Sequence, residues 1–256
     1  MRFAQPLWLA CALLTTLPVG RLVQARPTAA DVGRSVACYP WVGWLLGILL
    51  ELVAWVLPTT SPMLAAALLV VVWIALTGAL HLDGLADCAD AWSAGHADAS
   101  RCLAVMKDPA AGPMGVAAVV CVVLLKVAAL AALSTGPVAT WGGFLLASIV
   151  LARAAATALM VTGRYVRRQG IASMQSAWLP GAGLWIGLVL AGALALCVLP
   201  LGVALWVLPA VIAWTLVWRR AWRRRIGGYT GDIVGGLIET VETLVLVVGA
   251  LAMGGS

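Results

Sequence analysis

The 256 residues are too apolar for a soluble protein, because 63% are hydrophobic, only 10% are charged and the mean hydropathy is +1.05. Ordinary soluble domains contain roughly 45–50% apolar residues, so this composition excludes a soluble enzyme and indicates a protein that crosses a membrane several times. The net charge of +6 requires no nucleic-acid partner, since arginines that flank membrane helices and contact anionic lipids account for it.

The first segment imitates a secretory signal peptide, with Arg2 ahead of an apolar stretch from Leu7 to Leu17. Arginines at positions 21, 26 and 34 oppose export of the chain beyond this stretch. We therefore expect a short interfacial or re-entrant helix that is broken at Pro18. Cleavage of this segment is the alternative.

Seven apolar segments come next, and each is expected to cross the bilayer as a helix. They cover residues 36–57, 62–80, 113–133, 138–160, 183–200, 203–218 and 233–253. The longest polar connection, residues 81–112, is too short to build a hydrophobic core of its own. The sequence therefore predicts an all-α, polytopic helix bundle that forms a single membrane-embedded domain over residues 1–256.

Basic residues gather on one side of this arrangement. The connections at 58–61, 134–137 and 201–202 carry no charge. The opposite side holds Arg21, Arg26, Arg34, Arg101, Lys107, Arg164, Arg167, Arg168 and the arginines from Arg219 through Arg225. The positive-inside rule makes that side cytoplasmic.

An acidic motif comes directly after the second apolar segment, in the run from His81 to Asp90. On a helix Asp83, Asp87 and Asp90 stand at i, i+4 and i+7, so their carboxylates project from one face. Three clustered anions repel one another unless a cation lies between them. Ligands that are all oxygen suit a hard divalent ion, and Mg²⁺ bound partly through substrate phosphates matches them best.

A second acidic motif lies at residues 227–242. On a helix Asp232, Gly235, Gly236 and Glu239 share a face, with Glu242 at its edge. The two glycines leave room for the close approach of a helix or a ligand. Glu239 and Glu242 lie below the head groups, where ionisable side chains tend to be functional. The alternative is that they pair with Arg153 or another buried cation.

Glycines and basic loops on the same side provide candidate phosphate contacts. Glycines at 227, 228 and 231 precede a helix start, where backbone N–H groups can bind a phosphate. The loops at 106–115 and 164–170 contribute Lys107 and several arginines. Cationic loops that face an acidic metal site are what a phosphoanhydride substrate requires.

Four ordered motifs together resemble the cobalamin synthase family, and the resemblance extends over nearly the whole chain. They are the run from His81 to Asp90, the Met-Lys-Asp stretch at 106–115, the loop at 164–170, and Gly228-x-Thr230-Gly231-Asp232-x-x-Gly235 with Glu239-x-x-Glu242. The resemblance implies an adenosylcobinamide-GDP ribazoletransferase of the late vitamin B12 pathway. In that Mg²⁺-dependent reaction a ribose hydroxyl of α-ribazole, or of its 5′-phosphate, attacks the cobinamide-linked phosphate of adenosylcobinamide-GDP. GMP leaves, and adenosylcobalamin or its 5′-phosphate is formed.

The resemblance and the residue chemistry together give the expected roles. Asp83, Asp87 and Asp90 bind the metal, and Asp83, Asp87, Asp232 and Glu239 are catalytic, with Asp232 or Glu239 taking the proton or binding a second ion. Contacts to substrate and phosphate are expected from His81, Lys107, Asp108, Arg153, Arg167, Gly228, Thr230, Gly231 and Glu242. For His81 both a catalytic role and a hydrogen bond to a ligand-holding residue remain open. Position 110, often arginine in relatives, is Ala110 here, which leaves more of the phosphate binding to Lys107, Arg153 or Arg167.

The expected setting is the cytoplasmic (inner) membrane, with the active site on the cytoplasmic face. No cofactor beyond Mg²⁺ and no nucleic acid are expected, and the resemblance implies association with other late-pathway enzymes. A CDP-alcohol phosphotransferase is an alternative, but residues 91–108 lack the Gly-x-x-Ala-Arg continuation of its motif. A cation transporter is a further alternative. It is disfavoured because the aspartates are predicted at segment ends and no inverted repeat is evident.

Overall fold

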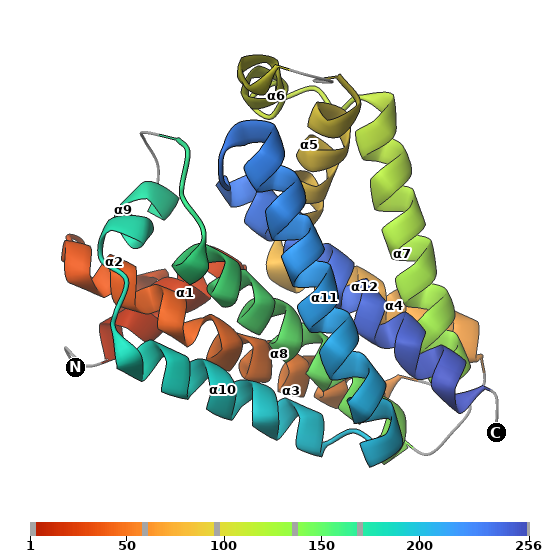
Figure 1. Cartoon of the computed structure of the whole chain (residues 1–256). Coiled ribbons are helices and arrows are strands. Elements are labelled where there is room, and N and C mark those ends of the chain that lie inside the picture. The colour runs from red at the N-terminus through yellow and green to blue at the C-terminus, as the bar shows by residue number, and fades with distance from the viewer. Residues whose placement is uncertain (1–3, 58–60, 95–97, 135–137, 168–170, 255–256) are drawn as a thin grey trace.

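The computed structural model describes residues 4–57, 61–94, 98–134, 138–167 and 171–254, and these form helices joined by short connections (Figure 1). The only pairing of extended chain in these ranges is an isolated bridge between Tyr165 and Tyr229. The helices are α1 Gln5–Leu14, α2 Ala29–Ser35, α3 Tyr39–Val56, α4 Pro62–Thr77, α5 Leu80–Ala94, α6 Ala99–Val105, α7 Pro113–Leu133, α8 Val138–Thr162, α9 Ile171–Ala177, α10 Ala182–Cys197, α11 Leu201–Ile226 and α12 Gly231–Met253, with 3₁₀ turns η2 at Val19–Leu22 and η3 at Val36–Cys38. The all-α prediction is confirmed.

Within the described ranges, five stretches of helix are long and apolar enough to cross a membrane. They are Ala29–Val56, which joins α2, η3 and α3, together with α7, residues Trp141–Thr162 of α8, α11 and α12. The bent pair α4 and α5 provides a sixth if it forms one span. This confirms a polytopic membrane protein but gives fewer full spans than the seven predicted. The predicted segment 183–200 forms α10 of 16 residues, about 24 Å long and short for a hydrocarbon core of about 30 Å.

Prolines, caps and left-handed residues set the ends of the helices. Pro62 and Pro113 occupy the first turns of α4 and α7, where a missing N–H costs nothing. The Thr230 hydroxyl caps α12 by accepting a hydrogen bond from the N–H of Ile233. At the C-terminal end of α11, Gly227 has a φ of 84°, and the helix therefore ends in the left-handed region that glycine tolerates.

The helices have two distinct ends, and the sequence motifs gather at one of them. The C-terminal ends of α3, α7 and α12 lie together at the lower right of Figure 1, near the starts of α4, α8 and α11. The opposite ends, with α5, α6, α9 and the first turn of α12, lie toward the top and left. This arrangement matches the two sides that the charge distribution predicted.

Helices α8 and α12 form the centre of the bundle, whereas α7 and α11 face outward. In their most apolar windows 83% of α8 and 72% of α12 are buried, against 33% for α7 and 17% for α11. Exposed large side chains such as Leu205 and Trp206 cover α11. A helix that is apolar around its circumference yet exposed suits contact with lipid.

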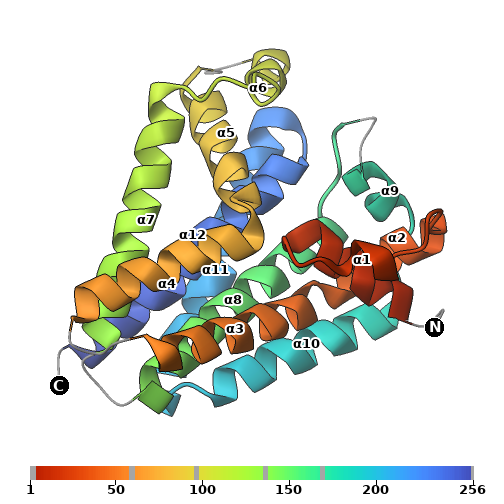
Figure 2. The ribbon, with the colours of Figure 1, turned by 180° about the vertical axis from the view of Figure 1, so that it is seen from behind.

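Helix α4 breaks sharply before the first acidic motif, as Figure 2 shows from behind. The two helices α4 and α5 meet at 90°, and Gly78 and Ala79 both have positive φ angles, of 61° and 56°. The N–H of Thr16 donates to the carbonyl of Leu76 at 2.8 Å, and its hydroxyl donates to that of Ala75 at 2.9 Å. Carbonyls that the break leaves unpaired are therefore satisfied by the chain just after α1.

The predicted short N-terminal helix is confirmed as α1, which ends at Leu14, before Pro18. It packs into the protein through Ala10, Cys11 and Leu14, all at most 4% exposed. Its location at the membrane interface and its retention in the mature protein stay predictions.

Candidate active site

The two acidic motifs meet where α5 crosses α12, and glycines allow the contact. A Cβ atom on Gly84 would lie 2.7 Å from the carbonyl oxygen of Asp232. A Cβ atom on Gly235 would lie 3.3 Å from the Cα of His81. Because contacts this close exclude larger side chains, Gly84 and Gly235 allow the run from His81 to Asp90 to lie beside the first turn of α12.

Three carboxylates come together at this crossing. Asp83 is exposed and Asp87 and Asp232 are partly buried. Asp87 lies close enough to Asp232 and Asp83 for both charges to act on it. The neighbouring cation is Arg167, whose Nη2 lies 2.7 Å from Oδ2 of Asp232. Three negative charges therefore face one guanidinium, and this excess of negative charge favours the binding of a cation.

A cavity of about 280 Å³ opens beside the carboxylates. Its polar lining comes from Tyr39, His81, Asp83, Tyr165, Arg167, Gln175 and Asp232, and its apolar lining from Leu13, Leu14, Leu80, Met160, Ile171, Val234 and Ile238, with Gly231 and Gly235 between them. We call it the site cavity. It draws on α1, α3, α5, α8, α9 and α12, so that segments far apart in the sequence build one pocket.

His81 and Gln175 differ in how the protein satisfies them. The Gln175 amide donates to the Ser35 hydroxyl at 3.0 Å and to the Tyr39 hydroxyl at 2.9 Å. His81 is 3% exposed, and neither of its ring nitrogens has a hydrogen-bond partner among the residues that the structure describes. A buried polar atom without a partner is costly, so His81 is free to bond to a molecule in the site cavity.

Asp90, the third predicted metal ligand, differs from Asp83 and Asp87 in that it accepts backbone hydrogen bonds. Its Oδ2 accepts a hydrogen bond from the N–H of Gly112 at 2.7 Å, and its Oδ1 accepts one from the N–H of Gly115 at 2.9 Å. Each oxygen thus helps to cap the start of α7 and keeps a further acceptor position, so a metal-binding role of Asp90 stays a prediction. Across the described part of the chain, no three His, Cys, Asp or Glu side chains converge as a ready metal site.

The segment at 163–167 is held beside the glycine motif by backbone hydrogen bonds. The N–H of Tyr229 donates to the carbonyl of Arg164 at 2.8 Å, and the N–H of Val166 donates to the carbonyl of Tyr229 at 3.1 Å. A Cβ atom on Gly228 would overlap the Arg164 carbonyl. The structure thus gives Gly228 a role in close chain approach, where a phosphate contact was predicted. Residues 168–170 of the predicted loop lie outside the described residues.

The remaining predicted residues near the site have mixed placements. Thr230 caps α12 and also donates to Asp232 at 3.2 Å, so it positions that carboxylate. Lys107 and Asp108 are exposed and do not line the site cavity. Asp108 accepts a hydrogen bond from the N–H of Ala110 in its own turn at 3.0 Å. Tyr165, in the loop after α8, has its pKa raised by burial, and the charge of Arg167 opposes this shift.

The family model for cobalamin-5-phosphate synthase matches residues 6–250. The chain belongs to this family. It is 45% identical to the adenosylcobinamide-GDP ribazoletransferase of Pseudomonas paraeruginosa strain PA7, over 96% of this chain and 98% of the relative. It is also 44% identical to the protein of that name from Stutzerimonas stutzeri, over 97% of this chain and 99% of the relative. No solved structure matches.

Membership of the cobalamin-5-phosphate synthase family places the chain among the transferases of cobalamin biosynthesis. It therefore favours the predicted transferase over a CDP-alcohol phosphotransferase or a cation transporter. The two carboxylates that line the site cavity, Asp83 and Asp232, belong to two of the motifs on which the family resemblance rests.

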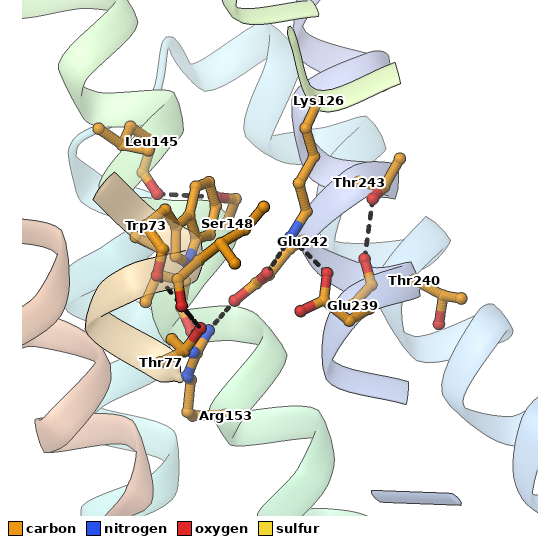
Figure 3. A network of polar contacts seen from close by, with 12 residues as sticks. Trp73, Thr77, Lys126, Leu145, Ser148, Arg153, Glu239, Thr240, Glu242 and Thr243 are labelled. Carbon is orange, nitrogen blue, oxygen red and sulfur yellow. Dashed lines mark hydrogen bonds and ion pairs between the residues drawn. The ribbon is translucent and has the colours of Figure 1, made fainter. Parts of the chain in front are cut away.

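Glu239, Glu242 and Arg153 lie apart from the site cavity in a buried ion network (Figure 3). Lys126 Nζ lies 2.6 Å from Oε2 of Glu239 and also contacts Glu242, which pairs with Arg153. All four side chains are at most 6% exposed. Two cations here balance two anions. The structure thus corrects the predicted roles of Glu239 as a catalytic residue and of Arg153 and Glu242 as substrate contacts, and it supports the alternative that they pair inside the membrane.

Sequence reasoning missed Lys126 as the second cation of this network. The signal was a single lysine inside the apolar stretch of α7, where a charge is costly unless a partner neutralises it. The ammonium also lies over the Trp73 ring, 4.3 Å from its centroid, which adds a further favourable contact.

Proposed function

We propose that this chain is an adenosylcobinamide-GDP ribazoletransferase. A ribose hydroxyl of α-ribazole, or of α-ribazole 5′-phosphate, attacks the phosphate that carries the cobinamide. A new phosphate ester forms, the phosphoanhydride bond breaks, and GMP departs, leaving adenosylcobalamin or its 5′-phosphate. The support is membership of the family, together with relatives of this name over almost the whole chain.

The observation that carries the proposal is that Asp83, Asp232 and Arg167 line one cavity, with Asp87 close enough to both carboxylates for their charges to act on it. Transfer of a phosphate between oxygens needs positioning and neutralisation of charge more than covalent help from the protein. A cluster of acidic residues with one guanidinium has the parts for both tasks.

The carboxylates of this site fit Mg²⁺, although among the described residues no three protein side chains converge on one metal position. Asp83 and Asp87 stand one helical turn apart and accept no hydrogen bond from that part of the chain. Mg²⁺ is commonly held by one or two carboxylates together with substrate phosphates and water. We therefore propose that Asp83 and Asp87 hold Mg²⁺ on the substrate diphosphate, where it supplies charge neutralisation and orientation.

The other residues of the site cavity have roles that their partners indicate. Arg167 is fixed by Asp232 and by the carbonyl of Met106, at 3.2 Å, and its guanidinium is the donor placed to bind the leaving phosphate. His81 lines the cavity, its ring nitrogens have no partner among the described residues, and it is therefore placed to accept the proton of the attacking hydroxyl. The apolar wall of Leu14, Met160 and Ile238 suits a flat aromatic base.

We further propose that the protein lies in the inner membrane and that its active site is on the cytoplasmic face. The arginines at the end of α11 lie at the same end of the bundle as α5 and the start of α12, and basic residues favour the cytoplasmic side. Association with other enzymes of the pathway stays a prediction.

The test is a complete reaction with purified protein in detergent, containing adenosylcobinamide-GDP, α-ribazole and Mg²⁺. GMP and the cobalamin product are measured together and should appear in equal amounts. EDTA should abolish both, and added Mg²⁺ should restore them. Replacing the phosphate donor by CDP-diacylglycerol should give no product. Absence of product with the proposed substrates under every divalent metal would refute the assignment.

A further inference from the structure

A second cavity lies beside the site cavity and shares no residue with it. Its volume is about 200 Å³. It is lined by Leu159, Thr162, Gly163, Arg164, Arg219, Arg223, Gly227, Gly228 and Tyr229. We call it the arginine cavity. The backbone pairing of Arg164 and Val166 with Tyr229 lies between the two cavities, since Tyr165, Arg167 and Asp232 line the other one.

The arginine cavity carries positive charge that the protein does not neutralise. All ten Asp and Glu residues of the chain lie in the described ranges. The ion pairs found there engage Lys126, Arg153 and Arg167, and none engages an arginine of this cavity. Three arginines contribute to the lining of this small volume, and their like charges repel one another unless an anion lies between them.

The donors of Arg219 show where such an anion would bind. Its Nη2 donates to the carbonyl of Thr162 at 2.6 Å, which fixes the side chain against α8. Its Nε is buried and has no partner in the described part of the protein. Because an unpaired buried N–H is costly, a fixed guanidinium with a free donor is prepared for a ligand that accepts hydrogen bonds.

The position of the arginine cavity selects a phosphate group as that ligand. Helix α11 has 26 residues and is about 39 Å long, longer than a hydrocarbon core of about 30 Å. Its basic end therefore reaches the head-group region, where lipid phosphates and soluble nucleotides are both available. Guanidinium groups match the geometry and charge of phosphate oxygens, whereas a cavity of this volume has no room for a corrin ring.

We propose that the arginine cavity is a binding site for a phosphate group, either of an anionic lipid or of a nucleotide. The arginine cavity lies beside the site cavity, because Tyr229 precedes Asp232 by three residues and so lies within about 11 Å of it along the chain. A phosphate bound to Arg164 and Arg219 fixes the segment that carries Arg167. This inference concerns binding and does not depend on the proposed function.

Binding is tested with full-length protein in nanodiscs of phosphatidylcholine. Equilibrium dialysis with radiolabelled pyrophosphate and GMP gives the affinity for soluble phosphates. Titration of phosphatidylglycerol into the nanodiscs, followed by native mass spectrometry of retained lipid, gives the affinity for lipid. Both are measured without divalent metal, so that binding at Asp83 and Asp87 does not contribute.

The matched variants remove equal charge from the same helix. Arg219→Gln with Arg223→Gln changes two residues of the cavity, and Arg220→Gln with Arg224→Gln changes two exposed arginines outside it. We expect the first pair to weaken binding of at least one probe more than tenfold and the second pair less than threefold. Arg223→Gln alone, which breaks no hydrogen bond of the described residues, guards against misfolding of the double variant and should weaken binding at least threefold.

Each outcome decides the proposal. Selective loss of pyrophosphate or GMP binding assigns the arginine cavity to a nucleotide phosphate, and selective loss of phosphatidylglycerol assigns it to lipid. Equal losses in the two double variants would reduce the arginines to general surface charge and overturn the site. Failure of wild-type protein to retain any of the three probes would overturn it as well.

Discussion

Helix α12 carries two acidic regions that differ in almost every physical respect. Asp232, in its first turn, borders an open cavity and shares a neighbourhood of excess negative charge with Asp83 and Asp87. Glu239 and Glu242, about 10–15 Å further along the axis, are buried and neutralised by Lys126 and Arg153. Both regions carry carboxylates, and what distinguishes them is whether the protein itself provides the compensating charge. The region whose negative charge the protein leaves uncompensated is the one that can bind a cation.

The strongest test of this difference is removal of an unbalanced carboxylate. Asp83→Asn or Asp87→Asn should lower kcat/KM for GMP release about 1,000-fold or more, because loss of a metal ligand costs several kcal/mol of barrier. The unfolding temperature in detergent should stay unchanged, since neither carboxylate holds another part of the described chain. Asp98→Asn, an exposed acid outside the site cavity, is the control for charge. Full activity in both Asp variants would remove the metal site from α5.

The buried ion network should respond in the opposite way. Glu242→Gln leaves Arg153 without its counter-ion and should lower the free energy of unfolding by about 3–5 kcal/mol. Denaturant or thermal unfolding in detergent measures this loss. The double variant Arg153→Met, Glu242→Gln should recover part of it, because Arg153 is then no longer a buried charge without a partner. A Glu242→Gln protein of normal stability but without activity would return Glu242 to the active site.

A substitution of Asp90 tests whether this residue of the first acidic motif caps α7 or binds the metal. Asp90→Asn keeps one acceptor for the N–H groups of Gly112 and Gly115 but loses the negative charge at the start of α7. We expect a loss of about 1 kcal/mol in unfolding free energy. The Mg²⁺ concentration for half-maximal activity should stay within twofold of wild type. A tenfold increase would show that Asp90 binds the metal after all.

We expect the smallest effect on stability from a substitution of Ala79, at the break before α5. Ala79 has a φ of 56°, a left-handed conformation that a Cβ atom disfavours. Ala79→Gly should therefore raise the free energy of unfolding by roughly 0.5–1 kcal/mol, measured by denaturant titration in detergent. A decrease would mean that packing of the Ala79 methyl group outweighs the backbone strain.

Local spacing predicted the parts of the site that lie within one helix. The positions of Asp83 and Asp87 result from helical geometry, and the glycines near Asp232 correctly predicted a close approach. Asp90 has the same periodicity, yet its hydrogen-bond partners are the N–H groups of Gly112 and Gly115, at a helix start more than twenty residues further along the chain. Spacing within one helix carries no information about such a partner.

Pairing between distant helices limited the rest of the prediction. Whether Glu239 and Glu242 serve the reaction or the bundle depends on Lys126, a residue of α7 that meets α12 only in the folded protein. The same reason hid Leu14 and Gln175, which line the site cavity from α1 and α9 but belong to no acidic motif. The overall helix pattern was accessible from composition, except where α4 and α10, with 16 residues each, proved too short for a full span on their own.

The site cavity takes Leu14 from the start of the chain, Asp83 from its first third and Asp232 from near its end. While the protein is being synthesised, α5 is in place long before α12 has left the ribosome, so the pocket can form only at the last stage of assembly. Nascent chains and truncated products that lack α12 accordingly have no complete pocket. Whatever the site cavity binds, only the full-length protein has the complete lining to bind it.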